Sequence, residues 1–311
     1  MRVGVSLSTF AAAPGTINVV DRAVELGAQA EGFGLDAVWF GQMASYDAVA
    51  VASAVGRAVP RIMVGPSVVP VFPRHPQMLA SAAKTAQAAT GGRFHLGVGL
   101  GGGDMEAAYG LPYPPRIRYL REYLTALRPL LAGRAEVYEG ETVVSRPFAD
   151  TAVAGAEPEI PVIVAAMGPQ ALKATGALAD GALPFLAGPR TIAGHIVPAL
   201  TEAAAAAGRP APRVVAAIAA VVTDDVAHAR AAAVERMAFY EGVPSYRRVL
   251  DLEGARRAGE IAVIGDEETV AGEVRRYLDA GATEVTLTQT DLNGEADRVR
   301  TWRLAGELAR G

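Results

Sequence analysis

Apolar and polar residues follow two different periods along this chain, and the change from one to the other predicts its elements. Short apolar runs with the composition of buried strands occupy 2–8, 36–41, 62–72 and 94–99. Each is followed by a stretch with helical spacing, at 17–34, 46–59, 76–90 and 115–131. Strands that alternate with helices in this way are typical of a parallel sheet covered by helices.

The second half of the chain continues the same alternation after an insert. Strands are predicted at 160–166, 181–185, 213–222 and 284–290, and helices at 168–180, 190–207, 224–240, 267–280 and 295–308. The insert at 132–159 contains a predicted hairpin at 136–144, and 241–266 is irregular and receives no element. Eight strand–helix units without a disordered linker predict a single α/β domain over 1–311, a (β/α)8 TIM barrel with an insertion after its fourth helix.

The helix predicted at 46–59 is apolar almost all the way round, which indicates burial on more than one side. Packing within the chain and a subunit interface would each explain this pattern. We expect the interface and predict a homodimer.

Composition narrows the possible functions of a chain of 311 residues. Apolar residues make up 51% and the net charge is −4, so the chain can form a large core and lacks the basic face that nucleic acids require. There is no cysteine, and the four histidines are scattered, which excludes a thiolate metal site and predicts no metal centre. The absence of a signal-like or membrane-length apolar run predicts a cytoplasmic protein that acts on a small molecule.

The stretch 61–103 contains the first candidate site. The apolar run 62–72 includes Pro66 and Pro70, so it cannot be a regular strand to its end. The next strand, 94–99, leads into a glycine-rich loop at 100–104. Neighbouring parallel strands end at the same edge of a sheet, where α/β folds bind their ligands.

The glycines at 97–102 fit the pattern G-x-G-x-x-G and admit three interpretations. A dinucleotide fold would place this pattern after the first strand, whereas here it follows the fourth. The glycines could also form only a flexible turn. In the third interpretation, missing side chains allow a flat ring or a chain to approach the backbone closely.

A second candidate site begins at Gly168-Pro169, where a predicted strand ends and a helix starts. Free N–H groups at a helix start can bind a phosphate. The loop at 186–189, after the neighbouring strand, would complete the phosphate site. No P-loop pattern is present, which argues against a nucleoside triphosphate.

Four segments together resemble the luciferase-like flavin and deazaflavin superfamily, and within it the coenzyme F420-dependent oxidoreductases. They are VGPSVVPVFPRHPQMLA (64–80), TGGRFHLGVGLGGG (90–103), IPVIVAAMGPQALKATGALADGAL (160–183) and IGDEETVAGEVRRYLDAGATEVTL (264–287). The resemblance implies a TIM barrel that binds a redox cofactor, F420 or alternatively FMN, at its C-terminal rim.

The resemblance also assigns the cofactor-binding residues. Ser67-Val68 would form a bulge with a cis peptide bond behind the central ring, and Ser8 and Gln42 would face that ring. The other residues implied near the ring or the phosphate are Gly99, Gly101, Gly102, Ala166, Met167, Gly168, Pro169, Ala187 and Gly188.

The sequence departs from this family at the positions that carry charge. Several relatives have an acidic residue and a histidine after strand two and a glutamate after strand four, where this chain has Gly41-Gln42 and Gly102-Gly103. This difference argues against the sugar-phosphate dehydrogenase subgroup. Gln42 and Asp104 remain as candidate catalytic residues, although an amide is not an ordinary general acid. His75, beside a helix start, is expected to be structural.

Three functions follow as hypotheses. The first is an F420-dependent reductase that transfers a hydride to a C=C or C=N bond of a small organic substrate. The second is an FMN-dependent monooxygenase, and the third is a cofactor-binding protein without catalytic activity. The segment 241–262, with Phe239, Tyr240, Tyr246 and Arg247, is expected to shape a partly apolar substrate pocket together with the insert 132–159 and the loop after strand four.

Overall fold

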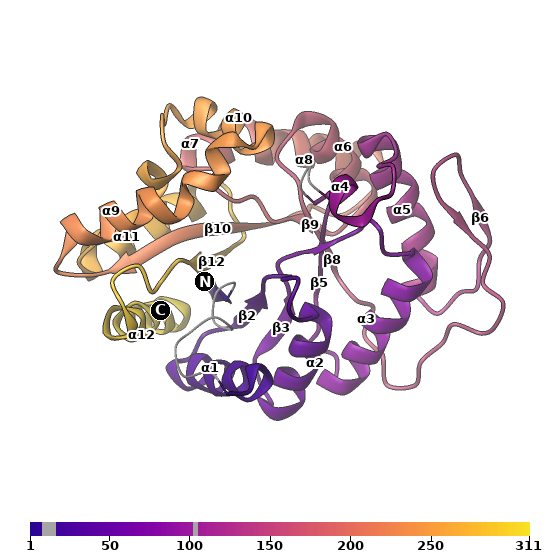
Figure 1. Cartoon of the computed structure of the whole chain (residues 1–311), viewed down its shortest axis with the longest axis horizontal. Helices are drawn as coiled ribbons and strands as arrows, with labels where there is room; N and C mark the ends of the chain where they lie inside the picture. Colours follow the sequence, from indigo (N-terminus) through magenta and orange to yellow (C-terminus); the bar gives the residue numbers. More distant parts are fainter. Residues whose placement is uncertain (8–16, 102–104) are drawn as a thin grey trace.

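The computed structural model describes residues 1–7, 17–101 and 105–311, which form a barrel of strands surrounded by helices (Figure 1). The strands are β1 (Arg2–Leu7), β2 (Ala37–Phe40), β3 (Met63–Pro66), β4 (Val69–Pro70), β5 (Leu96–Gly99), β6 (Tyr138–Glu139), β7 (Val144–Ser145), β8 (Val162–Ala165), β9 (Gly181–Ala182), β10 (Arg213–Val222), β11 (Val263–Gly265) and β12 (Glu284–Thr288).

The barrel is a closed ring of eight parallel strands. Around the ring the order is β3, β2, β1, β12, β10, β9, β8 and β5. A parallel bridge between Val64 and Phe94 joins β3 to the segment that leads into β5, and this contact closes the ring. The predicted TIM barrel is therefore confirmed, and the dinucleotide-fold interpretation of the glycines is wrong.

Helices lie outside the ring, as predicted. The longer ones are α1 (Val19–Phe33), α2 (Ala48–Ala58), α3 (Pro76–Thr90), α5 (Arg116–Leu131), α6 (Pro169–Leu178), α8 (Val197–Ala206), α9 (Val226–Met237), α10 (Pro244–Glu253), α11 (Glu267–Asp279) and α12 (Glu295–Arg310). Two shorter ones are α4 (Met105–Tyr109) and α7 (Pro189–Thr191), and α7 runs on through a π-helical turn, η2 (Ile192–Ile196), into α8. None of the helices in the described ranges is both long and apolar enough to cross a membrane.

The structure resolves the segment that the sequence pattern left unassigned, residues 241–266. It contains α10, two 3-10 turns, η3 (Ala238–Gly242) and η4 (Ala258–Ile261), and the short strand β11. β11 pairs with the last three residues of β10, beyond the part of β10 that belongs to the ring. The insert 132–159 contains the predicted hairpin, in which β6 pairs with β7.

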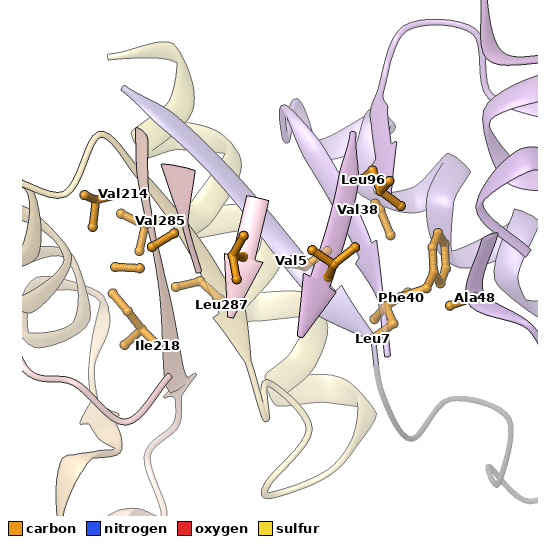
Figure 2. Close-up of a cluster of buried hydrophobic side chains, with 14 of the residues drawn as sticks. Val5, Leu7, Val38, Phe40, Ala48, Leu96, Val214, Ile218, Val285 and Leu287 are labelled. Carbon is orange, nitrogen blue, oxygen red and sulfur yellow. The ribbon is translucent and has the colours of Figure 1, made fainter. Parts of the chain in front are cut away.

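The two faces of the sheet carry different cores. The outward face packs against the helices through branched apolar side chains, including Val5, Val38 and Val285 (Figure 2). The inward face holds a separate cluster of Ala37, Trp39, Ile163, Leu183, Val215 and Ala217. This cluster packs part of the interior, and the ends of the strands are left to carry function, as in other TIM barrels.

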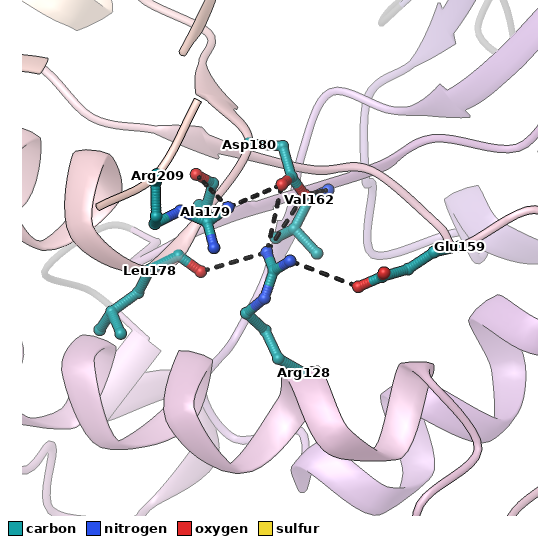
Figure 3. A network of polar contacts seen from close by, with 7 residues as sticks. All are labelled: Arg128, Glu159, Val162, Leu178, Ala179, Asp180 and Arg209. Atoms are coloured by element: carbon teal, nitrogen blue, oxygen red, sulfur yellow. Dashed lines mark hydrogen bonds and ion pairs between the residues drawn. The ribbon is translucent and has the colours of Figure 1, made fainter. Parts of the chain in front are cut away.

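Polar networks hold the N-terminal ends of the strands. Asp180 accepts hydrogen bonds from the Val162 N–H and from the guanidinium groups of Arg128 and Arg209, which joins α5, β8 and the segment after α8 (Figure 3). Nearby, Arg213 forms an ion pair with Glu284 and donates to Nδ1 of His95. Burial, followed by the charges of Arg213 and Arg2, lowers the pKa of His95 to about 3.

Packing within the chain accounts for the apolar helix α2. Six of its residues are buried, and the helix lies between α1 and α3. Its exposed positions are occupied by Ala50, Arg57 and Ala58. A subunit interface is therefore not needed to explain its composition, and the homodimer stays a prediction.

Candidate functional site

Unusual backbone conformations gather at the C-terminal ends of the strands. The peptide bond between Ser67 and Val68, directly after β3, is cis, as predicted. Leu186 has φ 60° and Gln289 has φ 53°, a region that side chains other than glycine rarely adopt. They follow β9 and β12, respectively. Residues other than glycine with a positive φ are concentrated at functional sites, so Leu186 and Gln289 point to this rim.

The glycines of β5 make room for the bulge after β3. A Cβ atom on Gly99 would lie 2.8 Å from Val68 Cγ2. One on Gly97 would overlap the carbonyl oxygen of Pro66, at the end of β3, and would lie 3.1 Å from Val68 Cγ1. Close approach does explain these glycines, as one interpretation held, but the approaching group belongs to the chain itself. Gly101 has φ 76°, so its glycine is required by the backbone conformation.

The start of α6 is an open helix N-terminus. Gly168 is the N-cap and makes no side-chain capping hydrogen bond, and Pro169 occupies the first helical position. The next two N–H groups, of Gln170 and Ala171, face the cap. Apart from its neighbours in the chain, no described residue has an atom within 4 Å of a Cβ built on Gly168, so the position beside this glycine is open.

The start of α7 is filled by a carboxylate from α10. Glu253 accepts hydrogen bonds from the Thr191 N–H at 2.8 Å, the Thr191 hydroxyl at 2.7 Å and the Arg190 N–H at 3.3 Å. A Cβ on Gly188 would overlap this carboxylate, so the glycine makes room for Glu253. The sequence indicated a phosphate-binding role for Ala187 and Gly188, whereas the N–H groups that follow them already bind an acidic side chain. No local pattern identified Glu253, which lies 62 residues from Thr191.

His195 links the two helix starts. The π-helical turn η2 carries it to the carbonyl oxygen of Met167, 3.0 Å from Nε2, directly before the α6 cap. A carbonyl can only accept, so Nε2 carries the proton. This bond fixes the turn in which Ala166 and Met167, both buried, lead from β8 into α6. No local sequence pattern indicated a role for His195.

The candidate catalytic residue Gln42 is fully hydrogen-bonded within the rim. Its Nε2 donates to the carbonyl oxygens of Met43 and Tyr46, each at 2.7 Å. Its Oε1 accepts from the Ala48 N–H at 3.1 Å and from Arg74 at 3.2 Å. These bonds favour a role in shaping the loop before α2, and a catalytic role for Gln42 stays a prediction.

The remaining predicted residues divide into three groups. Ser8, Gly102 and Asp104 lie outside the described residues. His75 is structural, as expected, because its Nδ1 caps α3 through the Gln77 N–H and its Nε2 lies 2.8 Å from the Val144 carbonyl oxygen. Ser67 does reach the rim, where its Oγ lies 2.7 Å from Oγ of Ser6.

The segment 239–247 contacts the rim through aromatic side chains. The ring of Phe185, which follows β9, makes edge-to-face contacts with Tyr240 at 5.1 Å and Tyr246 at 6.0 Å. Burial, followed by the effect of Tyr240, raises the pKa of Tyr246 to about 12, so its hydroxyl stays protonated at neutral pH. Phe239 is 71% exposed. This cluster places aromatic rings on one side of the rim, and its part in a substrate pocket stays a prediction.

Comparison with known proteins identifies the family. Residues 1–284 match the luciferase-like monooxygenase family. The chain belongs to this family. Among curated relatives, it is 27% identical over 252 residues to an F420-dependent glucose-6-phosphate dehydrogenase from Microbacterium testaceum, covering 73% of this chain and 72% of the relative. It is 25% identical over 268 residues to a 5,10-methylenetetrahydromethanopterin reductase from Methanopyrus kandleri, covering 73% and 76%.

A solved structure shares the fold of this chain. The coenzyme F420-dependent tetrahydromethanopterin reductase from Methanopyrus kandleri superposes with a TM-score of 0.82 at 24% identity, over 98% of this chain and 97% of that one. This similarity shows the fold. In this luciferase-like protein the cis peptide, β5 and the α6 start lie on neighbouring strands, because β5 pairs with β4 on one side and β8 on the other.

Proposed function

We propose that this luciferase-like protein is an F420-dependent oxidoreductase, and that it works as a reductase on a C=C or C=N bond of a small organic substrate. The observation that carries the proposal is the open N-terminus of α6, where uncapped N–H groups and free space suit a phosphate. F420 and FMN both carry such a phosphate. The relatives named for F420 favour F420 for this chain.

The residues at the rim fit the rest of such a cofactor. The N–H groups of Gln170 and Ala171, behind Gly168 and Pro169, would hold the phosphate. Val68, supported on Gly97 and Gly99, would support one face of the ring. When bound, reduced F420 supplies the hydride, and the protein supplies position and electrostatics.

The chain's own groups would place the substrate and exclude water. The aromatic cluster of Phe185, Tyr240 and Tyr246 offers an apolar surface on the β9 side of the rim. The loop held by Gln42 lies at the end of β2. We assign Asp104 as a candidate proton donor from its place in the sequence. Because the positions after strands two and four lack the charged residues of several relatives, we propose a reductase and not a sugar-phosphate dehydrogenase.

The experiment that tests this function is a pair of titrations of the apoprotein, one with F420 and one with FMN, followed by the absorption spectrum of the bound cofactor. We expect tight binding of F420 and weak binding of FMN. Reduction of an unsaturated or imine acceptor by reduced F420 should then be accelerated. Tight FMN binding without F420 binding, together with oxygen consumption in the presence of reduced FMN, would replace the proposal with a monooxygenase.

We also propose a homodimer. Met78 on α3 is 62% exposed and Phe148 in the insert is 93% exposed, which leaves large apolar side chains uncovered. These two elements touch, because His75 at the α3 cap contacts the Val144 carbonyl oxygen. Light scattering of the purified protein measures the mass directly, and a monomer at micromolar concentration would contradict this part of the proposal.

A further inference from the structure

The inward face of β12 is polar from the base of the barrel to the rim. Glu284, Thr286 and Thr288 alternate along the strand, so their side chains share one face. The register places Thr286 opposite Gly4 of β1 and Ala217 of β10. Ala217 belongs to the inner apolar cluster, so this face points into the barrel. Interiors of TIM barrels are usually filled by bulky branched side chains, which makes this face unusual.

Two hydroxyl groups on this face lack a partner in the described chain. Thr286 is 0% exposed and Thr288 is 9% exposed, and neither Oγ1 makes a hydrogen bond with a described residue. A buried polar group without a partner costs about 1–3 kcal/mol. The residues opposite these hydroxyls, Gly4, Ala217 and Ala219, are small and offer no side-chain partner, although Ala37 fills the space directly in front of Gly4. Buried polar groups without a protein partner are commonly bonded to ordered water.

Polar groups continue this face at both ends. At the base, Glu284 binds Arg213 at 2.5 Å and 2.8 Å, beside an open cavity of about 560 Å³ that Arg2 and Thr283 also line. At the rim, Ser6 lies two residues beyond Gly4 on β1, and its hydroxyl is 2.7 Å from that of Ser67.

The strand between Ser6 and Ser67, β2, does not separate their side chains. β2 lies between β1 and β3, and Gly41 at its end has no side chain to separate the hydroxyls. The hydroxyl of Ser67 belongs to the cis peptide bulge of the candidate site.

We propose that the inward face of β12 holds a file of ordered waters that conducts protons from the base cavity to the rim. Its use rests on the proposed function, because reduction of a double bond by hydride forms one C–H bond and needs one proton for the neighbouring atom. Each hydroxyl would accept a proton from the water below it and release its own proton to the water above. Bulk water at the base replaces the proton that the substrate gains, and reduced F420 is the reductant.

A crystal structure of the apoprotein at high resolution tests the water file without any cofactor. We expect ordered waters hydrogen-bonded to Oγ1 of Thr286 and of Thr288 in the wild type. In Thr286→Val, which keeps the shape of the side chain, the water at this position should disappear. A dry interior around both threonines in the wild type would overturn the proposal, whatever cofactor the protein binds.

Turnover measurements test whether the file carries protons. Thr286→Val should lower the rate of substrate reduction about tenfold or more and change its solvent isotope effect, while F420 affinity stays the same. Its stability should not fall, because the lost hydroxyl has no partner in the described chain. Thr288→Ser, which keeps a hydroxyl, should turn over close to the wild-type rate, and Thr288→Val should not.

Thr301→Val is the matched control. The Thr301 hydroxyl is buried, but it accepts from the Val222 N–H at 2.8 Å and donates to the Asp297 carbonyl oxygen at 2.7 Å, outside the barrel. This variant should lose stability and keep its turnover rate. A wild-type rate and isotope effect in Thr286→Val would overturn the proton path. Absence of F420 turnover in the wild type would instead contradict the proposed function, and the crystal structure would still decide whether the waters are there.

Discussion

Two helices begin at the same rim, and their first N–H groups differ in what binds them. At α6 the cap is Gly168, and neither a side-chain cap nor a described atom fills the space beside it. At α7 the cap is Gly188, and the carboxylate of Glu253 binds the N–H groups that follow. Both starts read G-P in the sequence, so the same dipeptide serves an open site in one place and an internal contact in the other.

A helix start therefore indicates a binding site for a ligand anion only when no carboxylate of the chain already binds its free N–H groups. The partial positive charge at a helix N-terminus favours any nearby carboxylate or phosphate. Three other helices that begin at this rim are capped by an aspartate of the chain, α2 by Asp47, α9 by Asp225 and α11 by Asp266. We therefore place the cofactor phosphate at α6 and expect α7 to contribute no direct contact.

Gly168→Asp should have the largest effect, because it copies the arrangement of α7 at α6. The backbone of Gly168, with φ −80° and ψ 150°, accepts any residue, and an aspartate there would cap the helix. We expect F420 affinity to fall about 100-fold, since the new carboxylate occupies the N–H groups and repels the phosphate. Calorimetric titration measures the affinity.

Gly168→Asn is the control for Gly168→Asp, because it offers a similar cap without the charge. Its affinity should lie between those of the wild type and the aspartate variant. Thermal unfolding of both variants should occur at or slightly above the wild-type temperature. Unchanged F420 binding in Gly168→Asp would show that the phosphate lies elsewhere.

Glu253→Ala is the reverse experiment at α7. Removing the carboxylate leaves the Arg190 and Thr191 N–H groups without their partner, and we expect a loss of about 2 kcal/mol in the free energy of unfolding. Urea denaturation measures this loss. Glu253→Gln, which keeps an acceptor oxygen, should lose less. F420 affinity should change little, and a clear gain in affinity on removal of the carboxylate would mean that α7 is a second phosphate site.

Some elements of the fold could be predicted from the sequence, and others could not. Periodicity located the eight ring strands, and the start and end of α3 at Pro76 and Thr90 agree with the structure to the residue. Such local features depend on nearby residues, which a pattern can show. The segment 241–266 could not be assigned, because β11 has only three residues and α10 supplies a cap to a helix far away in the sequence.

Within the candidate site, too, some features could be predicted from the sequence and others could not. The turn at Gly168 followed from the local Gly-Pro pattern after a predicted strand. The cis peptide after Ser67 followed only from resemblance to a family, which records an arrangement in space. The partner of Gly97 and Gly99 was not predictable from spacing, since Val68 reaches them from the bulge between β3 and β4. The internal bonds of Gln42 were missed for a similar reason, because its partner Arg74 lies 32 residues away.

Gln42→Ala tests whether Gln42 stabilises the fold, as the residues that cap the neighbouring helices do, or takes part in catalysis. We expect a loss of about 1 kcal/mol in the free energy of unfolding, because its hydrogen bonds to the Tyr46 carbonyl and the Ala48 N–H are removed. Turnover should fall by less than about tenfold. Guanidinium denaturation and steady-state kinetics measure the two quantities. A loss of more than about 100-fold in kcat at unchanged stability would assign Gln42 to catalysis.

Asp47→Asn should have the smallest effect and depends on pH. Burial by itself raises the pKa of Asp47, but hydrogen bonds from the Ala50 N–H and from Arg74 outweigh it, so the pKa lies below its usual 3.8. A lowered carboxyl pKa stabilises the fold above pH 3.8, and this contribution disappears as the pH falls through the lower folded value. Asparagine also caps helices, so at pH 7 we expect a loss of only about 0.5 kcal/mol, from the ion pair with Arg74. Thermal unfolding at pH 7 and near pH 3 should show the gap between the two proteins narrowing at the lower pH. A gap that widens in acid would mean that the charge on Asp47 does not stabilise α2, and that this capped helix start differs from that of α7.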